Sequence, residues 1–552
     1  MTRLFIIQVR GHDVYASRLD RQYTPNSSSE AIAVRGNIYF EEKGGDIISA
    51  ATVKESFFVE INPSLIEKPD IICEKINEVV PLDKEMCEAQ ARKEDDSYEI
   101  VLDKISFEEA EKIKKIGKVG LYAPAKSLRF YPGGSLASQV LGFVGYKGDT
   151  LLGRYGLEQY YEDVLRGKKE SLNEGGSFAS LFWDLGRDFL GDEVLVGHDV
   201  ILTIEPRVQS LLENALAEIV EEWDADSAGG LIIDPQTGVI LAMSGKPDFN
   251  PNEYGKVEDI SYFRNPLVSS IFEMGSIMKP LTLASSMDAG KITAETTYYD
   301  SGYVVFNNKR IENYDGKARG RVDMQAVLSE SLNTGAVFAM QELGKKNFLD
   351  YLKSFGFDET TGIDLPDEVE GKISNLDSMR DIEYATASFG HGIAVSPIEF
   401  AMAVSSLANG GYLMEPSVVK KIQVDGGQDS VTEPITRRQV LKSETTKEIT
   451  RMLVEVVDDA LLGGTVKLDR YSLAAKTGTA QLNKPILEGG GYYDDQYFHS
   501  FFGYGPASDS KFLIFLYVKK PQGVRYASET LTEPFIDLMK FLFNYYQIPP
   551  DR

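Results

Sequence analysis

Three short polar motifs, far apart in the chain, constrain its fold more than any other feature. They are Ser276-Ile-Met-Lys279, Ser331-Leu-Asn333 and Lys476-Thr-Gly-Thr479, and 55 and 145 residues separate their first members. If these side chains act together, helices and strands from distant parts of the sequence have to meet around one groove. Such a fold needs a sheet that is assembled from separate segments.

In the first motif, Ser276 and Lys279 stand at positions i and i+3, so on a helix their side chains lie on one face. Pro280 is tolerated only in the first turn of a helix, which predicts that a helix starts close to Ser276. A serine hydroxyl becomes a nucleophile when a base takes its proton, and a lysine can be that base if burial or another cation lowers its pKa. Alone, the pair is more typical of an N-capping serine beside a solvated lysine.

Each of the other two motifs, taken singly, is also more typical of ordinary structure than of an active site. Ser331 and Asn333 can face one cleft from a turn between helices, or they can form a helix C-terminus that ends near Asn333. Lys476–Thr479 follows a predicted strand at 471–475 and offers a positive charge and hydroxyls for a carboxylate, but it could also be a polar strand edge. All three motifs together, in this chain order, predict a serine acyltransferase of the penicillin-recognising class.

The surrounding sequence predicts a mixed α+β fold with its main domain boundary near 196, dividing the chain into 1–195 and 196–552. Residues 168–197 are rich in Gly, Ser and Asp and are interpreted as a connection. Ser106 with Glu109 predicts a capping box at a helix start. Further predicted elements are strands at 57–62, 200–204, 498–504 and 512–518, a hairpin joining 230–234 to 239–243, a helix over Pro206–Trp223, and an amphipathic helix carrying Phe535, Ile536, Met539 and Leu542.

Charge and composition exclude several classes of function. The 58 basic and 84 acidic residues give a net charge of −26, which repels phosphate backbones and argues against nucleic-acid binding. The two cysteines, Cys73 and Cys87, exclude a disulfide-dense scaffold; their spacing leaves pairing open, and two free thiols are the favoured interpretation.

No metal site is predicted either. Four histidines without HExxH spacing argue against a catalytic zinc, and Asp458-Asp459 is interpreted as a solvated helix end. The histidines are His12, His198, His391 and His499.

No apolar run of about 18 residues occurs, so no membrane span is predicted, and no secretion signal is visible. The apolar start at Met1–Val9 is either the remnant of a segment removed upstream or a first β-strand.

Further motifs occur along almost the whole chain. They are Arg129-Phe-Tyr-Pro132, Ser138-Gln-Val-Leu-Gly142-Phe-Val-Gly145, Gly156-Leu-Glu-Gln-Tyr-Tyr161, Leu202-Thr-Ile-Glu205, Gly362-Ile-Asp-Leu-Pro366, Phe389-Gly-His-Gly-Ile393 and His499-Ser-Phe-Phe-Gly503. With the three polar motifs, they make the chain resemble a class B, monofunctional penicillin-binding protein. The resemblance implies a transpeptidase domain, with an antiparallel sheet flanked by helices and an all-helical subdomain, on an elongated α+β N-terminal pedestal.

The resemblance also implies a D,D-transpeptidase of peptidoglycan synthesis that needs no cofactor. Ser276 would attack the carbonyl between two terminal D-alanines, neutral Lys279 would take its proton, and Ser331 would relay that proton to the leaving amine. An amine of a neighbouring stem peptide would then resolve the acyl-enzyme into a cross-link. β-Lactams would acylate the same serine.

The remaining motif residues would bind the substrate in this resemblance. Lys476, Thr477 and Thr479 would hold the terminal carboxylate beside Gly478, and Asn333 would bind the peptide backbone. The backbone N–H groups of the serine nucleophile and of Thr479 would form the oxyanion hole.

Four features depart from the family pattern. Met274 stands where proline is common, Ala475 where glycine is common, and His391 where glutamine or tyrosine is usual. None removes a reacting group, so they bear on substrate preference and β-lactam sensitivity. The fourth is the absence of the usual N-terminal membrane helix; the resemblance implies a place on the extracytoplasmic face of the bacterial membrane, with a glycan polymerase and divisome or elongasome proteins as partners.

Three alternatives share much of this pattern. A β-lactamase would need a group that activates water, and no acidic motif can be assigned to that role. A D,D-carboxypeptidase differs only in resolving the intermediate with water. A β-lactam sensor or non-catalytic scaffold could keep the same fold. The sequence does not separate roles in division, elongation and sporulation, and it does not identify the acceptor peptide.

Overall fold

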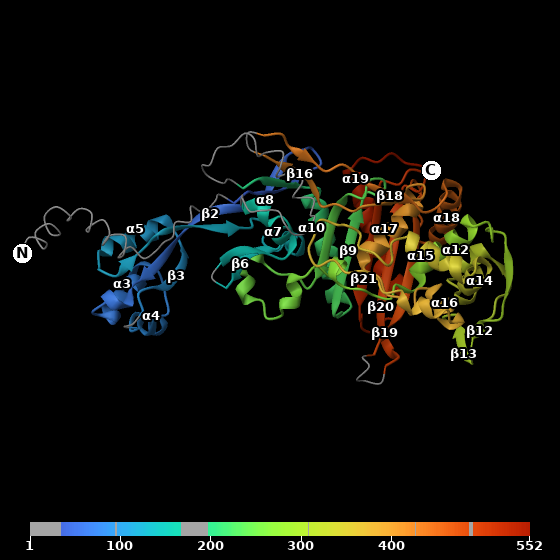
Figure 1. The fold of residues 1–552 in the computed structure, drawn as a ribbon, viewed down its shortest axis with the longest axis horizontal. Coiled ribbons are helices and arrows are strands. Elements are labelled where there is room, and N and C mark those ends of the chain that lie inside the picture. The colour runs from blue at the N-terminus through green and yellow to red at the C-terminus, as the bar shows by residue number, and fades with distance from the viewer. Residues whose placement is uncertain are drawn as a thin grey trace, which may run out of the picture. The chain divides into compact units, whose positions relative to one another are not determined.

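The computed structural model describes residues 35–93, 96–148, 150–166, 197–306, 308–424, 427–484 and 490–552. Helices and strands alternate along most of the chain, which confirms the mixed α+β class (Figure 1). His12, the apolar start at 1–9, and the predicted connection up to residue 196 lie outside the described residues.

The chain forms two compact units, and the first is built mainly from Ala51–Phe130. The long strand β2 (Ile47–Ile61) pairs antiparallel with β3 (Glu99–Ile105), β4 (Leu121–Tyr122) and β5 (Ala125–Phe130). The helices α3 (Pro69–Val79), α4 (Lys84–Ala91) and α5 (Phe107–Ile116) add apolar side chains to a core that also contains Phe57, Val59 and Ile61. The predicted strand at 57–62 therefore lies in β2, which ends just before Pro63.

Helix α5 begins with the capping box that the sequence predicted. Ser106 Oγ accepts a hydrogen bond from the Glu109 backbone N–H, and the Glu109 carboxylate accepts one from the Ser106 N–H. The two bonds satisfy backbone donors that no carbonyl inside the helix can reach.

Cys73 on α3 and Cys87 on α4 form a disulfide, with their Cα atoms 5.9 Å apart. The favoured interpretation of two free thiols is therefore wrong. Both cysteines are buried in the core of this unit, where α3 packs against α4. Sequence spacing could not show that the two helices turn the cysteines toward each other.

The second unit contains Ile38–Ala50, Tyr131–Glu162 and Asp199–Arg552, and its centre is a five-stranded antiparallel sheet. The strand order is β10 (Ile240–Lys246), β9 (Ser227–Ile233), β21 (Phe512–Lys519), β20 (Tyr492–Gly505) and β19 (Ala474–Asn483). Strands from both ends of this region therefore lie side by side, which confirms the predicted assembly (Figure 1).

Strand β19 differs from its predicted bounds in a way that matters for the third motif. Strand β19 runs from Ala474 to Asn483, not over 471–475, so Lys476–Thr479 lies within the ladder. Polar side chains end the apolar run after Ala475, but pairing depends on backbone groups, which continue to match β20.

Helices cover both faces of this sheet. On one face, α10 (Pro206–Glu222) and α19 (Ala527–Tyr545) share a core with sheet residues such as Ile514 and Phe501. On the other face, α17 (Pro397–Ala408) places Phe400 against Phe502 and Phe515. Successive residues of a strand point to opposite faces, so Phe501 belongs to the core with α10 and α19 on one face and Phe502 packs against α17 on the other.

A further group of helices in this unit carries two of the motif residues, Lys279 and Asn333. It contains α12 (Lys279–Asp288), α13 (Met324–Ser329), α14 (Asn333–Leu343), α15 (Lys345–Ser354), α16 (Asp381–Ala387) and α18 (Ser443–Glu455). This group corresponds to the helical subdomain that the resemblance implied.

The predicted strand at 200–204 lies outside the five-stranded sheet. It corresponds to β8 (Asp199–Leu202), which pairs with β1 (Ile38–Glu41) and with β16 (Val419–Gln423). The strand ends at Leu202, before the helix that starts at Pro206.

Asp458 differs from the prediction of a solvated helix end. Its carboxylate is largely buried and forms ion pairs with Lys467 and Arg552. In the described part of the chain, no helix combines the length and the apolar character that crossing a bilayer would require.

Candidate active site

Ser276 lies in the short 3-10 helix η5 (Gly275–Met278), which continues directly into α12. Pro280 occupies the first turn of α12, as predicted. The Lys279 side chain turns back toward the serine, and its Nζ lies 2.9 Å from Ser276 Oγ. The two side chains therefore share one face of the helix start.

Ser331 lies on the turn between α13 and α14, the arrangement that the cleft interpretation predicted. Its backbone has φ 54°, a left-handed conformation that is uncommon outside glycine. Ser331 Oγ lies 3.1 Å from Lys279 Nζ and 3.2 Å from Lys476 Nζ. This hydroxyl therefore bridges the two lysines, and motifs 145 residues apart meet at one point.

Lys476, Thr477, Gly478 and Thr479 lie on β19, the edge strand of the central sheet. Lys476 Nζ also donates to the Thr477 carbonyl at 3.0 Å, and the Ala527 N–H donates to Thr479 Oγ1 at 3.1 Å.

Asn333 begins α14, so the alternative of a helix ending there is wrong. The Asn333 Nδ2 group donates a hydrogen bond of 2.8 Å to the Glu312 carbonyl on strand β13 (Lys309–Glu312). This hydrogen bond fixes the Asn333 amide, whereas the lysine pair contacts Ser276, Ser331 and the Thr477 carbonyl.

The two lysines are buried, and burial changes their acidity. Lys279 is 0% exposed, and desolvation, followed by the nearby charge of Lys476, holds the pKa of Lys279 well below its ordinary value. Burial lowers the pKa of Lys476 to about 8. The lowered pKa increases the fraction of Lys279 that is an uncharged amine able to accept a proton, whereas Lys476, with a pKa of about 8, still mostly carries a positive charge at neutral pH.

A polar cluster that the sequence did not single out lies directly before Ser276. The Glu273 carboxylate accepts hydrogen bonds of 3.0 Å from Tyr492 OH and from Asn483 Nδ2, and it lies 3.9 Å from His391 Nδ1. The Gly275 N–H donates to the Gly390 carbonyl at 3.1 Å.

This cluster joins the segment that precedes Ser276 to the β19–β20 hairpin and to the Phe389–Ile393 motif. Burial is the largest effect on the pKa of His391 and lowers it, so its imidazole is mostly neutral at pH 7. Tyr492 lies 219 positions from Glu273, so no local pattern could have revealed the contact.

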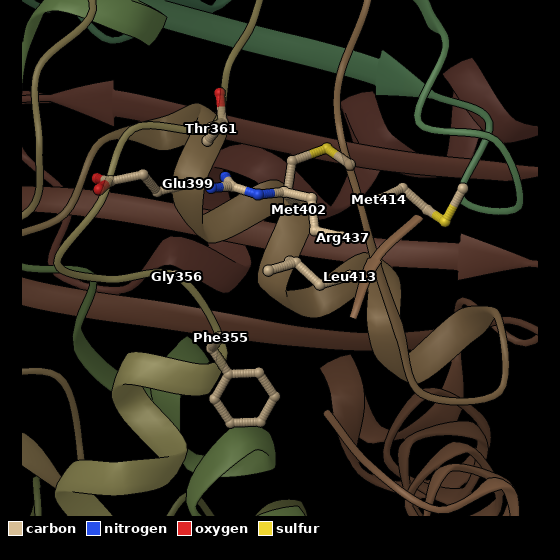
Figure 2. Close-up of a pocket in the computed structure, with 8 residues that line it drawn as sticks. All are labelled: Phe355, Gly356, Thr361, Glu399, Met402, Leu413, Met414 and Arg437. Carbon is tan, nitrogen blue, oxygen red and sulfur yellow. The ribbon is translucent and has the colours of Figure 1, made fainter. Parts of the chain in front are cut away.

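A separate small cavity lies elsewhere in the second unit (Figure 2). It has room for about one water molecule. Its lining residues are Phe355, Gly356, Thr361, Glu399, Met402, Leu413, Met414 and Arg437. None of them belongs to the three polar motifs, so the cavity is not part of this site.

Two family models match the chain. The penicillin binding protein transpeptidase domain matches residues 228–540, and the penicillin-binding protein dimerisation domain matches residues 30–173. The first range contains all three polar motifs.

Relatives along nearly the whole chain support these matches. Stage V sporulation protein D of Bacillus subtilis is 32% identical over 516 residues, which cover 91% of this chain and 78% of the relative. The probable peptidoglycan D,D-transpeptidase PenA of Neisseria meningitidis serogroup A is 25% identical over 527 residues, covering 94% and 86%. The fold resembles the crystal structure of penicillin binding protein 3 from Mycobacterium tuberculosis complexed with aztreonam, with a TM-score of 0.70, 22% identity, and coverage of 94% and 98%.

Proposed function

The chain belongs to the class B penicillin-binding proteins, and from this premise we propose that it cross-links peptidoglycan stem peptides through an acyl-enzyme on Ser276. Its activity is that of a peptidoglycan D,D-transpeptidase, and it binds β-lactams. One observation carries the choice of nucleophile: Ser276 Oγ lies 2.9 Å from the amine of Lys279, which is fully buried.

In the first step, Ser276 Oγ attacks the carbonyl carbon between the two terminal D-alanines. Lys279, whose pKa is lowered by burial and by the nearby charge of Lys476, accepts the hydroxyl proton in its uncharged form as the C–O bond forms. Ser331 relays that proton to the leaving amine, and the C–N bond breaks to release D-alanine. The position of Ser331 Oγ, 3.1 Å from Lys279 Nζ, supports this relay.

Substrate binding falls to the edge strand and to the start of α14. Protonated Lys476 attracts the terminal carboxylate, Thr477 and Thr479 donate hydroxyl hydrogen bonds to it, and Gly478 lets the peptide approach the strand. Asn333 hydrogen-bonds the peptide backbone. An exposed strand edge offers unpaired backbone groups to an extended peptide, which supports this assignment.

The tetrahedral intermediate carries a negative charge on the former carbonyl oxygen. The backbone N–H groups of Ser276 and Thr479 stabilise this oxyanion, at roughly 3 kcal/mol for each donor. In the second step the amine of a neighbouring stem peptide attacks the acyl-enzyme and forms the cross-link. Its proton returns through Ser331 and Lys279 to Ser276 Oγ.

The chain acts on the cell wall, outside the cytoplasm, and we place it on the extracytoplasmic face of the membrane. A membrane glycan polymerase that supplies the glycan strands, with divisome or elongasome proteins, is the proposed partner set. The proposed division of labour assigns docking and spacing to residues 1–195 and catalysis to residues 196–552. The match of the dimerisation-domain family to residues 30–173 supports it.

The test is covalent labelling with a fluorescent penicillin. Ser276→Ala should abolish the label, and Ser269→Ala is the matched control, because Ser269 Oγ only donates to the Asn265 carbonyl. Intact mass after reaction with benzylpenicillin, followed by peptide mapping, should place one adduct on Ser276. Persistent labelling of Ser276→Ala would refute the assignment. Rapid hydrolysis of the adduct would instead favour a β-lactamase.

A further inference from the structure

Ser500, on strand β20, lies behind the active site and contacts both backbone segments that carry the proposed oxyanion donors. Its Oγ lies 2.9 Å from the Met274 carbonyl oxygen and 3.3 Å from the Gly478 carbonyl oxygen. Met274 stands two residues before Ser276, and Gly478 directly precedes Thr479. Ser500 is 0% exposed, so its hydroxyl cannot reach a substrate in the groove.

The strand register explains how one hydroxyl reaches both segments. Gly478 pairs directly with Ser500 across the β19–β20 ladder. A Cβ atom at position 478 would lie 2.4 Å from Ser500 Oγ and 2.8 Å from the Met274 oxygen. The missing side chain of Gly478 therefore leaves the space that the Ser500 hydroxyl occupies. Glycine is therefore required at position 478 for a structural reason, which does not depend on how closely a ligand approaches the strand.

The geometry of the peptide bond links this hydroxyl to Thr479. A trans peptide is planar, so its C=O and N–H point in opposite directions. The Gly478 carbonyl shares its peptide unit with the Thr479 N–H. The Gly478 carbonyl oxygen lies on the β20 side, 3.3 Å from Ser500 Oγ, so the Thr479 N–H is directed away from β20.

The segment before Ser276 is fixed at both ends of one peptide unit. The Met274 carbonyl contacts Ser500 Oγ, and the N–H of Gly275, in the same unit, donates to the Gly390 carbonyl at 3.1 Å. Gly275 has φ 64°, a left-handed conformation that favours glycine, and it turns the chain into Ser276. Ser500 and Gly390 thus anchor the turn that presents the Ser276 N–H.

We propose that Ser500 is a positioning residue whose hydroxyl sets the separation of the two oxyanion donors, the N–H groups of Ser276 and Thr479. This inference rests on the proposed function, since it presupposes that these two groups bind the oxyanion. A hydroxyl has one proton and donates to one carbonyl at a time, and the contact with Met274 is the shorter of the two. Oxyanion donors act only within about 2.7–3.1 Å, so a small shift in either segment weakens the hole.

The experiment separates binding from chemistry in Ser500→Ala. Acylation of the full chain by a fluorescent penicillin is followed by stopped flow, giving the noncovalent Kd and the limiting acylation rate. We expect the rate to fall about 10- to 100-fold, as for a small misplacement of reacting groups, with Kd within about twofold of the wild type. The matched control is Ser405→Ala: Ser405 is also 0% exposed, but its Oγ donates to the Ala401 carbonyl inside α17.

Two more measurements exclude a general folding defect. Deacylation uses the same hole, so the adduct of Ser500→Ala should also be lost more slowly, whereas partial unfolding would lower the labelled fraction and leave the rates unchanged. Ser500→Cys keeps a weaker donor and should show an intermediate acylation rate. This variant carries the test if the alanine variant does not fold.

Wild-type rates in both Ser500 variants would overturn the proposal, and so would a raised Kd with an unchanged rate. Failure of the proposed function gives a different result. In that case the wild-type adduct does not map to Ser276, whereas a failure of this inference alone leaves the adduct on Ser276 in every variant.

Discussion

The two compact units of this chain differ in what stabilises them and in the ionisable groups that they bury. The first unit has a small core around β2–β5 and three helices, cross-linked by Cys73–Cys87. The second covers both faces of a five-stranded sheet with helices, and it buries Lys279 and Lys476 within its site. A small core supplies little stability by itself, so a covalent cross-link adds usefully to it. A large core supplies enough stability to offset the free energy that burying ionisable groups costs. The proposed catalytic residues lie in the unit with the larger core.

Replacing the buried base gives the largest expected effect. Lys279→Met introduces an apolar side chain of similar length and removes the amine that accepts the proton. We therefore expect the acylation rate to fall about 10³-fold or more. The free energy of unfolding should stay level or rise, because the buried amine serves catalysis and its removal relieves a desolvation cost. Stopped-flow acylation and urea unfolding measure the two quantities.

Lys540→Met is the control, because Lys540 is exposed and pairs only with Asp537 along its helix. It should change neither quantity. If Lys279→Met lost stability and kept its acylation rate, the buried lysine would be a structural residue, and the contrast between the units would fail.

The two lysines also predict a pH dependence that belongs to the second unit. Acylation should rise with pH while Lys279 loses its proton, and this limb lies well below the ordinary lysine range because its pKa is lowered. It should fall above about pH 8, as Lys476 loses the charge that attracts the carboxylate. The profile of the second-order acylation rate against pH measures both limbs.

Lys476→Ala separates the two limbs of this profile. The alkaline limb should disappear, and the acid limb should move to higher pH, because the charge of Lys476 is one cause of the lowered Lys279 pKa. An alkaline limb that persists in this variant would show that another group carries it.

Removing the disulfide tests the other side of the comparison. The double variant Cys73→Ala/Cys87→Ala opens a loop with a sequence separation of 14, which should cost the first unit about 3 kcal/mol of unfolding free energy. Hydrogen exchange of residues 51–130 in increasing urea reports that loss. Penicillin acylation of the same sample is the internal control and should be unchanged. Loss of acylation in parallel with the exchange protection would show that the units unfold together.

The fold could be predicted where the signal is local. The hairpin of β9 and β10, the helix from Pro206 and the capping box at Ser106 all follow from periodicity or from residue types a few positions apart. The true extent of β19 and the disulfide could not be predicted, because both depend on which backbone or helix lies alongside.

The site divides in the same way. The convergence of Ser276, Lys279, Ser331 and Lys476 could be predicted because the proposed chemistry demands particular residue types at short fixed spacings, and the structure brings these side chains within hydrogen-bond distance. The residues that hold them in place could not be found. The contact of Ser500 with Met274 joins residues 226 positions apart, and no local sequence pattern predicts it.

The smallest expected effects come from a motif that occurs in both units. A capping box of Ser106 and Glu109 begins α5, and one of Ser396 and Glu399 begins α17. Hydrogen bonds from Ser106 lower the pKa of exposed Glu109, whereas burial raises the pKa of Glu399 to about 7. The same local geometry therefore lies in water in one unit and in a packed interior in the other.

Burial should decide what each serine contributes to stability. Ser106→Ala should cost about 1 kcal/mol, the usual value of an N-cap whose freed N–H can bind water. Ser396→Ala should cost about 2 kcal/mol, because Ser396 is 0% exposed and the freed Glu399 N–H is left buried without an acceptor. Urea unfolding at pH 7, followed by hydrogen exchange in each unit, measures both losses. Equal costs would mean that water reaches the start of α17, and the contrast between an exposed and a packed helix start would not hold.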